Sequence, residues 1–197
     1  APHVIHTILL NLARALAVVM MVQGHCLDAL LAPTYATGPG FDAWLWIRGL
    51  SSVVFATVAG YVFAVASNRR WQEHASFAPP ARRRVGRMLS FLALGYALHF
   101  PVRGLADFVG LSEDRWRAFL QADVLQMIAV SLLALVLLVV ATRQRRRFAA
   151  VALTLGTVTA LVTPLMRLHD WGTSAPAWLA AYFYESGGSN FPLFPWS

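Results

Sequence analysis

The segment LLNLARALAVVMMVQGHCLDALL, residues 9–31, is long and apolar enough to cross a bilayer as a helix, yet it carries Arg14, His25 and Asp28. An ionisable group at the bilayer centre costs roughly 2.5–3.5 kcal/mol on insertion scales, so such groups usually face a cavity and serve a function there. At about 100° and about 1.5 Å per residue, His25 lies within about 20° of Arg14 and about 16 Å farther along the helix. Asp28 follows one turn later, about 60° round the same side. We therefore expect these three side chains to line one polar track across the membrane.

The composition of the chain is typical of a membrane protein. Of its 197 residues, 58% are hydrophobic and 13% are charged, whereas soluble domains average about 45–50% apolar and about 25% charged residues. The net charge of +7 comes from arginines that lie beside apolar runs, where topology and lipid headgroups explain them, so we expect no nucleic-acid partner. The sequence has no HExxH, CxxC, GxGxxG or Walker motif, and we expect neither a metal site nor soluble nucleotide chemistry.

Five apolar stretches approach the length of about 20 residues that a membrane span needs. They are Ile5–Leu31, Phe41–Ser67, Met88–Val102, Ala122–Thr142 and Phe148–Met166. The stretch FPLFPWS at 191–197 indicates the start of a sixth. We expect an all-α, polytopic transmembrane helix bundle with about five full spans plus the start of a sixth, in which residues 1–197 form the N-terminal part of a longer membrane domain.

Loop charges predict the orientation of the chain in the membrane. The loops after the second and the fourth span together hold ten arginines against one acid, Glu73. These arginines are Arg69, Arg70, Arg82, Arg83, Arg84, Arg87, Arg143, Arg145, Arg146 and Arg147. By the positive-inside rule both loops, and with them the N-terminus, are cytoplasmic. We expect an integral protein of a bacterial inner (plasma) membrane, with Arg14 toward the cytoplasm and His25 toward the outer leaflet.

The polar track offers a catalytic interpretation and a structural one. The imidazole of His25 titrates near neutral pH and can take a proton from an attacking amine or hydroxyl, while Asp28 can orient the ring and stabilise its charged form. Alternatively, His25 is bonded to a neighbouring helix and Asp28 is an ordinary interfacial acid. Arg14 either snorkels to the headgroups or binds a phosphate, for which its planar fork is suited.

Four further residues are candidates for binding a substrate. Arg48 either anchors the second span at the interface or contacts substrate. Asp123 and Gln126 share a face of the fourth span, where Gln126 either binds substrate or joins two helices. Asn190 precedes the aromatic and proline residues at 191–196 and either supplies a hydrogen-bonding group at the mouth of a cavity or belongs to a loop whose prolines open a helix.

Taken in order, several segments resemble a known family. The stretch ARALAVVMMVQGHCLDAL at 13–30 resembles the first-helix signature, close to L-D-x-x-R-G-x-A-x-x-x-M-x-x-x-H, of the heparan-α-glucosaminide N-acetyltransferase-like family of transmembrane acyltransferases. SSVVFATVAGYVFAVA at 51–66 resembles the second helix of that family, VLQMIAVSLL at 124–133 its LQ-I-G helix, and FPLFPWS its aromatic-proline motif. The chain departs from the signature at Asn11, where the family often has Asp.

The resemblance implies a fold, a reaction and roles for individual residues. The family fold has about ten or eleven helices, of which this chain would be roughly the first half. The implied reaction passes an acetyl group from cytoplasmic acetyl-CoA to a sugar amine or hydroxyl, a glycan-type acceptor, on the far side of the bilayer. By the same resemblance His25 is the active-site histidine, Arg14 lies on the acetyl-CoA side, and Asn190 lies by the acceptor site. A homodimer is compatible with the sequence.

Two other classes of protein fit the polar track as well. In a proton- or ion-coupled transporter segment, Arg14, His25 and Asp28 would line the ion path. In an accessory subunit, these groups would only hold helices together. Hydrolysis of acetyl-CoA by the full-length protein would distinguish the acyltransferase from both.

Overall fold

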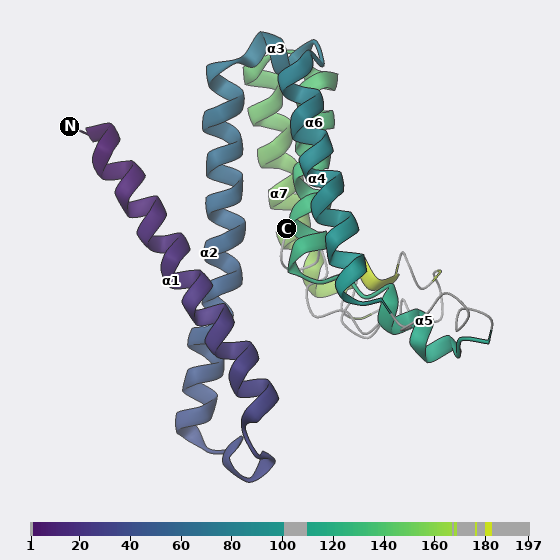
Figure 1. Cartoon of the computed structure of the whole chain (residues 1–197). Helices are drawn as coiled ribbons and strands as arrows, with labels where there is room; N and C mark the ends of the chain where they lie inside the picture. Colours follow the sequence, from purple (N-terminus) through teal and green to yellow (C-terminus); the bar gives the residue numbers. More distant parts are fainter. Residues whose placement is uncertain (1, 101–109, 167, 169–175, 177–179, 183–197) are drawn as a thin grey trace. The chain divides into compact units, whose positions relative to one another are not determined.

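The computed structural model describes residues 2–100, 110–166, 168, 176 and 180–182, without the side chains of residues 2–7 and 33. All regular structure in these residues is helical, which confirms the all-α prediction (Figure 1). The elements are α1 (Pro2–Leu30), the 3-10 helix η1 (Pro33–Tyr35), α2 (Pro39–Arg69), α3 (Trp71–Ala75), α4 (Pro79–Leu98), α5 (Glu113–Phe119), α6 (Val124–Thr142) and α7 (Arg145–Met166).

Within the part of the chain that the structure describes, four helices are long and apolar enough to cross a membrane. They are α1 from Ile8 onward, α2, α6 and α7, and they correspond to the first, second, fourth and fifth predicted spans. The third predicted span, Met88–Val102, falls partly on α4 and is not among the four. The first half of α4 carries four arginines, so its apolar part within the described residues, Met88–Leu98, is only about 16 Å long.

The chain forms two compact units, residues 1–62 and 63–197. The first unit is a helical hairpin of α1 and the greater part of α2, joined through η1 (Figure 1). The contact made by α1 is narrow, because Ala17 and Gly24 are the only buried residues among its described side chains. Both are small and lie seven positions apart, hence within about 20° of each other on one face of the helix.

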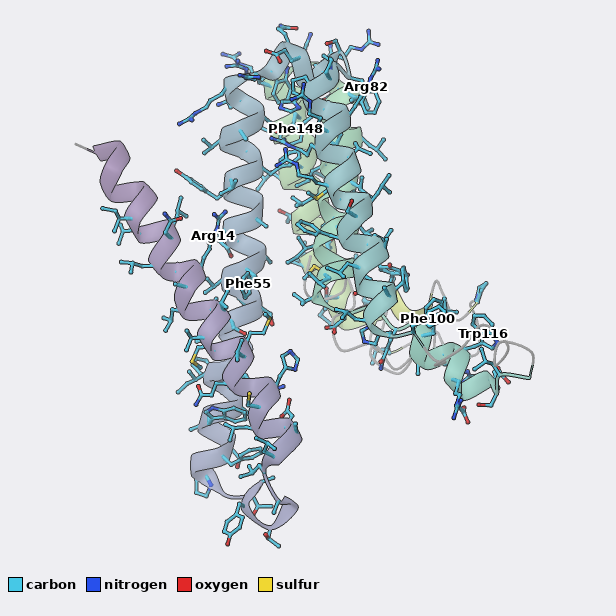
Figure 2. All side chains as sticks on the ribbon, in the orientation of Figure 1. Arg14, Phe55, Arg82, Phe100, Trp116 and Phe148 are labelled. Atoms are coloured by element: carbon cyan, nitrogen blue, oxygen red, sulfur yellow. The ribbon has the colours of Figure 1, made fainter. Side chains whose placement is uncertain are left out.

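The core of the second unit lies where the end of α2 meets α3, α6 and α7. Phe63 and Trp71 pack with Val136 and Val139 of α6. The ring of Phe148, which Figure 2 labels near the start of α7, meets Trp71 edge-on at 5.5 Å between centroids. Burial of aromatic rings in such pairs is the strongest apolar contribution available to a small cluster.

The same cluster joins the two arginine-rich segments. The indole Nε1 of Trp71 donates a hydrogen bond to the backbone oxygen of Arg143 at 3.0 Å, and the guanidinium of Arg145 donates to the backbone oxygen of Asn68 at 3.1 Å. Residues 69–87 and 143–147 therefore meet at one end of the second unit, as expected for loops on one side of a membrane.

Local sequence explains where these helices begin and end. Pro79 opens α4, and proline suits the first turn because its missing N–H would have no partner there. Asp123 is the N-cap of α6. Arg143 ends that helix in the left-handed conformation, with φ 55°, and its backbone N–H donates to the oxygen of Val139.

Candidate active site

The polar track of α1 has the helical geometry that its spacing predicts. Arg14 and His25 both belong to one uninterrupted helix, α1, so their side chains leave it within about 20° of each other. Figure 2 labels Arg14 on this helix. Arg14 is half-buried and His25 is exposed, and neither forms a hydrogen bond or ion pair with any described residue.

No hydrogen bond or ion pair joins Asp28 to His25 in the part of the chain that the structure describes, and the role of Asp28 in orienting the ring stays a prediction. The two carboxylate oxygens of Asp28 accept hydrogen bonds from the two terminal nitrogens of Arg48 on α2, each at 2.6 Å. The guanidinium carbon of Arg48 also lies 5.3 Å from the centre of the Trp44 ring, within the range of a cation–π contact. A bidentate pair of this kind matches the planar fork of arginine, which is why it outcompetes a histidine one turn away.

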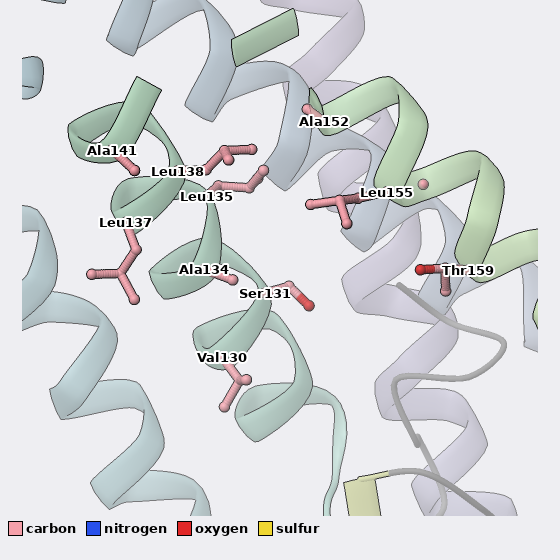
Figure 3. A pocket seen from close by; sticks show the side chains of 11 residues that line it. Val130, Ser131, Ala134, Leu135, Leu137, Leu138, Ala141, Ala152, Leu155 and Thr159 are labelled. Atoms are coloured by element: carbon pink, nitrogen blue, oxygen red, sulfur yellow. The ribbon is translucent and has the colours of Figure 1, made fainter. Parts of the chain in front are cut away.

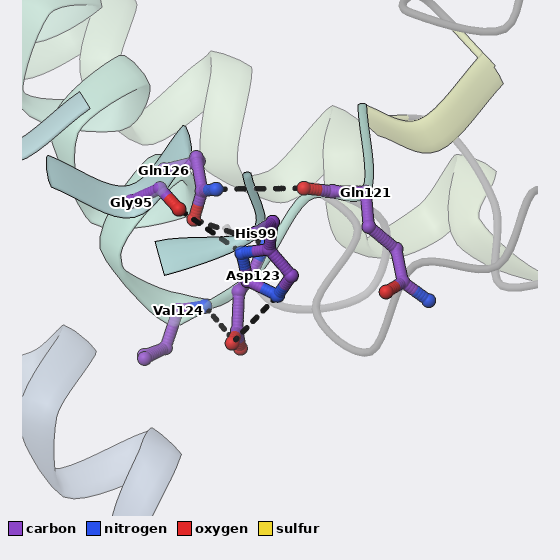
Figure 4. Close-up of polar contacts among 6 residues, drawn as sticks. All are labelled: Gly95, His99, Gln121, Asp123, Val124 and Gln126. Atoms are coloured by element: carbon purple, nitrogen blue, oxygen red, sulfur yellow. Dashed lines mark hydrogen bonds and ion pairs between the residues drawn. The ribbon is translucent and has the colours of Figure 1, made fainter. Parts of the chain in front are cut away.

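The side chains of Asp123 and Gln126 form hydrogen bonds that cap the start of α6 (Figure 4). A carboxylate oxygen of Asp123 accepts from the backbone N–H of Val124 at 2.7 Å, and the amide oxygen of Gln126 accepts from the backbone N–H of Asp123 at 3.2 Å. The amide nitrogen of Gln126 donates to the backbone oxygen of Gln121 at 3.4 Å. The carboxylate of Asp123 also accepts from the backbone N–H of Gln126, so the arrangement is a capping box. Both polar atoms of the fully buried Gln126 thus have partners within the protein.

Sequence reasoning gave no role to His99, which the structure joins to this cap. Its Nδ1 lies 3.0 Å from the backbone oxygen of Gly95 and its Nε2 lies 3.8 Å from a carboxylate oxygen of Asp123 (Figure 4). The ring thus links the end of α4 to the start of α6. An acid followed three residues later by Gln before an apolar run is the usual signature of a capping box, so the sequence did contain a signal for the role of Asp123.

The remaining predicted site residue, Asn190, lies outside the described residues. Among the residues that the structure does describe, no group of three or more His, Cys, Asp or Glu side chains is placed to hold a metal ion.

A groove of about 630 Å³ lies between α6 and α7 in the second unit (Figure 3). Small residues, among them Ala134, Ala152 and Gly156, make it hollow, and Ser131 and Thr159 carry the polar side chains in its lining. None of the described residues that line it is titratable.

The arginine-rich end of the second unit is strongly basic and partly buried. The Arg84 guanidinium donates to the hydroxyl of Ser67 at 2.7 Å and lies 4.8 Å from the ring centre of Phe63. Burial, reinforced by the nearby charge of Arg84, lowers the pKa of His74 below its ordinary value. Because burial and the charge of Arg84 both disfavour the cationic form of His74, this side chain is neutral in the folded protein near pH 7.

Comparison with models of known protein families identifies the family of this chain. The model of the family described as "Heparan-alpha-glucosaminide N-acetyltransferase, catalytic" matches residues 7–197. The chain belongs to this family. It is accordingly an integral membrane protein of a family of acetyltransferases, in agreement with the resemblance of its first, second and fourth spans and its aromatic-proline motif. No match was found among curated proteins or among solved structures. The match to the heparan-α-glucosaminide N-acetyltransferase family includes α1 from residue 7 and hence both Arg14 and His25.

Proposed function

We propose that this protein moves an acetyl group from cytoplasmic acetyl-CoA to an amine or hydroxyl of a glycan-type acceptor on the far side of a bacterial inner membrane. One observation carries the proposal: an exposed imidazole without a partner among the described residues and an arginine share one edge of a spanning helix. Family membership supplies the class of reaction, and the ten arginines of residues 69–87 and 143–147 favour the cytoplasmic orientation of that end.

His25 is the proposed general base. As the acceptor nitrogen or oxygen attacks the thioester carbonyl, His25 takes the proton that the acceptor loses, and the carbon–sulfur bond breaks when the tetrahedral intermediate collapses. The proton then passes to the departing thiolate, so that free CoA and the acetylated sugar are the products. The exposure of His25 and the absence of a hydrogen bond from it to any described residue support this role.

Arg14 is the proposed contact for the anionic part of acetyl-CoA. It lies about 16 Å from His25 along the same edge of α1, and CoA is a long phosphorylated carrier that can place its phosphates near one residue and its thioester near the other. Guanidinium groups bind phosphate oxygens through paired hydrogen bonds. By the family resemblance, Asn190 and the aromatic-proline motif lie by the acceptor.

The test is the kinetics of acetyl-CoA turnover by the purified full-length protein. His25→Ala should lower kcat by about 10²–10⁴-fold, the usual contribution of a general base, while the variant stays monodisperse in detergent. Gln23→Ala is the matched control, because Gln23 is exposed on the same helix and outside the proposed site. A well-folded His25→Ala protein with near-normal kcat would refute the mechanism, and proton-coupled uptake without acyl transfer would favour the transporter.

A further inference from the structure

Three residues surround the guanidinium of Arg48 in the α1–α2 hairpin, and we call this arrangement the Arg48 clamp. Asp28 accepts two hydrogen bonds at 2.6 Å, and the ring of Trp44 lies 5.3 Å from the guanidinium carbon. Gly24 of α1 lies directly against the side chain of Arg48. These contacts hold Arg48 in one rotamer, because a guanidinium with two hydrogen bonds to Asp28 and a contact with the Trp44 ring has little freedom to rotate.

Gly24 has no side chain and so leaves a notch on α1 that the side chain of Arg48 occupies. A Cβ at this position would lie 2.8 Å from Nε and 3.0 Å from Cδ of Arg48, closer than side-chain atoms approach without displacement. Gly24 and Asp28 are four residues apart, so both face α2 within about 40° of each other. Arg48 therefore contacts two successive turns of α1, and these contacts fix the rotation of α1 about its own axis.

Little else in the hairpin fixes the rotation of α1. Ala17 and Gly24 are the only buried residues among the described side chains of this helix, and neither offers a side chain that interlocks with α2. His25 lies about 100° from Gly24 around the helix, and Arg14 lies within about 20° of His25. The setting held by the clamp thus decides which way both track residues face.

We propose that Arg48 is a positioning residue, which, through Asp28 and the notch at Gly24, sets the rotation of α1 and so presents His25 to the reacting groups. The inference rests on the proposed function of His25. It assigns Arg48 a role through α1 in place of direct contact with substrate, and it gives Asp28 the same role.

Kinetics of the full-length protein test the proposal first. Arg48→Lys keeps the charge but loses the second hydrogen bond to Asp28 and the guanidinium contact with Trp44. Gly24→Ala places a Cβ against the Arg48 side chain and displaces it. Both should lower kcat by about tenfold to a hundredfold, since misplacement of a reacting group by about 1 Å can cost that much, and both should also raise the KM for acetyl-CoA, because Arg14 turns with the same helix. Gly49→Ala is the matched control and should leave kcat unchanged, because a Cβ there meets nothing within 4 Å.

A double-variant comparison identifies the cause of the glycine requirement. If Gly24 is required because Arg48 occupies its notch, then Gly24→Ala should have no further effect on kcat in a protein that already carries Arg48→Ala. Additive losses from the two substitutions would show that Gly24 acts independently of Arg48 and would overturn the clamp.

The rotation of α1 can be followed without activity through Cys26, the single cysteine of this chain, which is exposed. A nitroxide on Cys26, with any cysteine elsewhere in the full-length protein replaced by serine, reports its accessibility to oxygen and to a water-soluble nickel chelate. Arg48→Lys and Gly24→Ala should change the ratio of the two accessibilities, whereas Gly49→Ala should not. Reduced kcat with an unchanged ratio would overturn positioning in favour of direct contact, and an altered ratio with normal kcat would overturn it as well. If His25→Ala is fully active, the proposed function fails, while the nitroxide still measures whether the clamp sets the helix.

Discussion

Gly95 of α4 lies directly against the side-chain amide of Gln126 of α6, so closely that a Cβ on Gly95 would be 2.6 Å from the amide carbon. This approach allows the fully buried Gln126 to reach back and complete the cap of its own helix. Because the amide cannot move away without breaking that cap, the absence of a side chain at position 95 is a requirement of the α4–α6 contact.

Gly95→Ala should therefore destabilise the protein by about 1–3 kcal/mol, the usual cost of overpacking a close contact. The measurement is thermal unfolding of the purified protein in detergent. Gly86→Ala on the same helix is the control, because a Cβ there meets nothing within 4 Å, and it should stabilise α4 by up to about 1 kcal/mol through helix propensity. Equal shifts in Tm for the two variants would contradict the packing argument.

The buried His74 should make stability depend on pH. Its pKa is lowered in the folded state by burial first and by Arg84 second, whereas in the unfolded chain it stays near 6.5. The unfolded state therefore binds a proton more readily, so the contribution to stability is complete above about pH 6.5 and is lost as the pH falls toward the lower folded value. Between pH 7.5 and pH 5.5 the wild-type Tm should fall more than that of His74→Gln. Parallel losses of Tm would show that other groups dominate.

Arg14→Ala should raise the KM for acetyl-CoA by about tenfold to a hundredfold and change kcat less, because a charge-assisted hydrogen bond to phosphate is worth roughly 1.5–3 kcal/mol of binding. Steady-state kinetics at varied acetyl-CoA give both constants. Arg117→Ala is the matched control, since Arg117 is exposed and paired with Glu113 at 2.9 Å within α5. The binding role is wrong if the two variants have the same KM.

Single cysteines test the orientation of the chain. With Cys26 replaced, cysteines at Ser76 and Gln144 should resist an impermeant thiol reagent applied to intact cells, because the arginine-rich end is expected in the cytoplasm. Cysteines at Thr37 and Ser112, both exposed, should react. Labelling at Ser76 or Gln144 from outside would reverse the orientation and place the acetyl-CoA side at the opposite face.

Sequence patterns predicted the helices well and the pairing of side chains less well. Apolar length alone predicts α1, α2, α6 and α7, because a bilayer span requires about 20 such residues. The partner of Asp28 was not predictable in the same way, since Arg48 is 20 residues away and hydropathy does not set the rotation of one helix against another. Proximity along α1 favoured His25, whereas the fork of Arg48 provides the stronger bond.

The sequence offers Asp123 and Gln126 as candidates for binding a substrate, with the joining of two helices as the alternative for Gln126. The structure shows that backbone N–H groups at the start of a helix account for both side chains. The pattern of an acid followed by Gln at the third position was visible, but nothing in the sequence indicated that Gly95 would leave the space needed to bury the amide.

The ion pair between Asp28 and Arg48 also bears on how the protein is made. Each residue lies in a helix apolar enough to span the bilayer, and an unpaired charge costs free energy on entering hydrocarbon, up to roughly 2.5–3.5 kcal/mol at the bilayer centre. Joined by two hydrogen bonds at 2.6 Å, they enter as a unit without net charge. The free energy of insertion is therefore lowest when α1 stays at the translocon until α2 has been made and both helices enter the bilayer together as one hairpin.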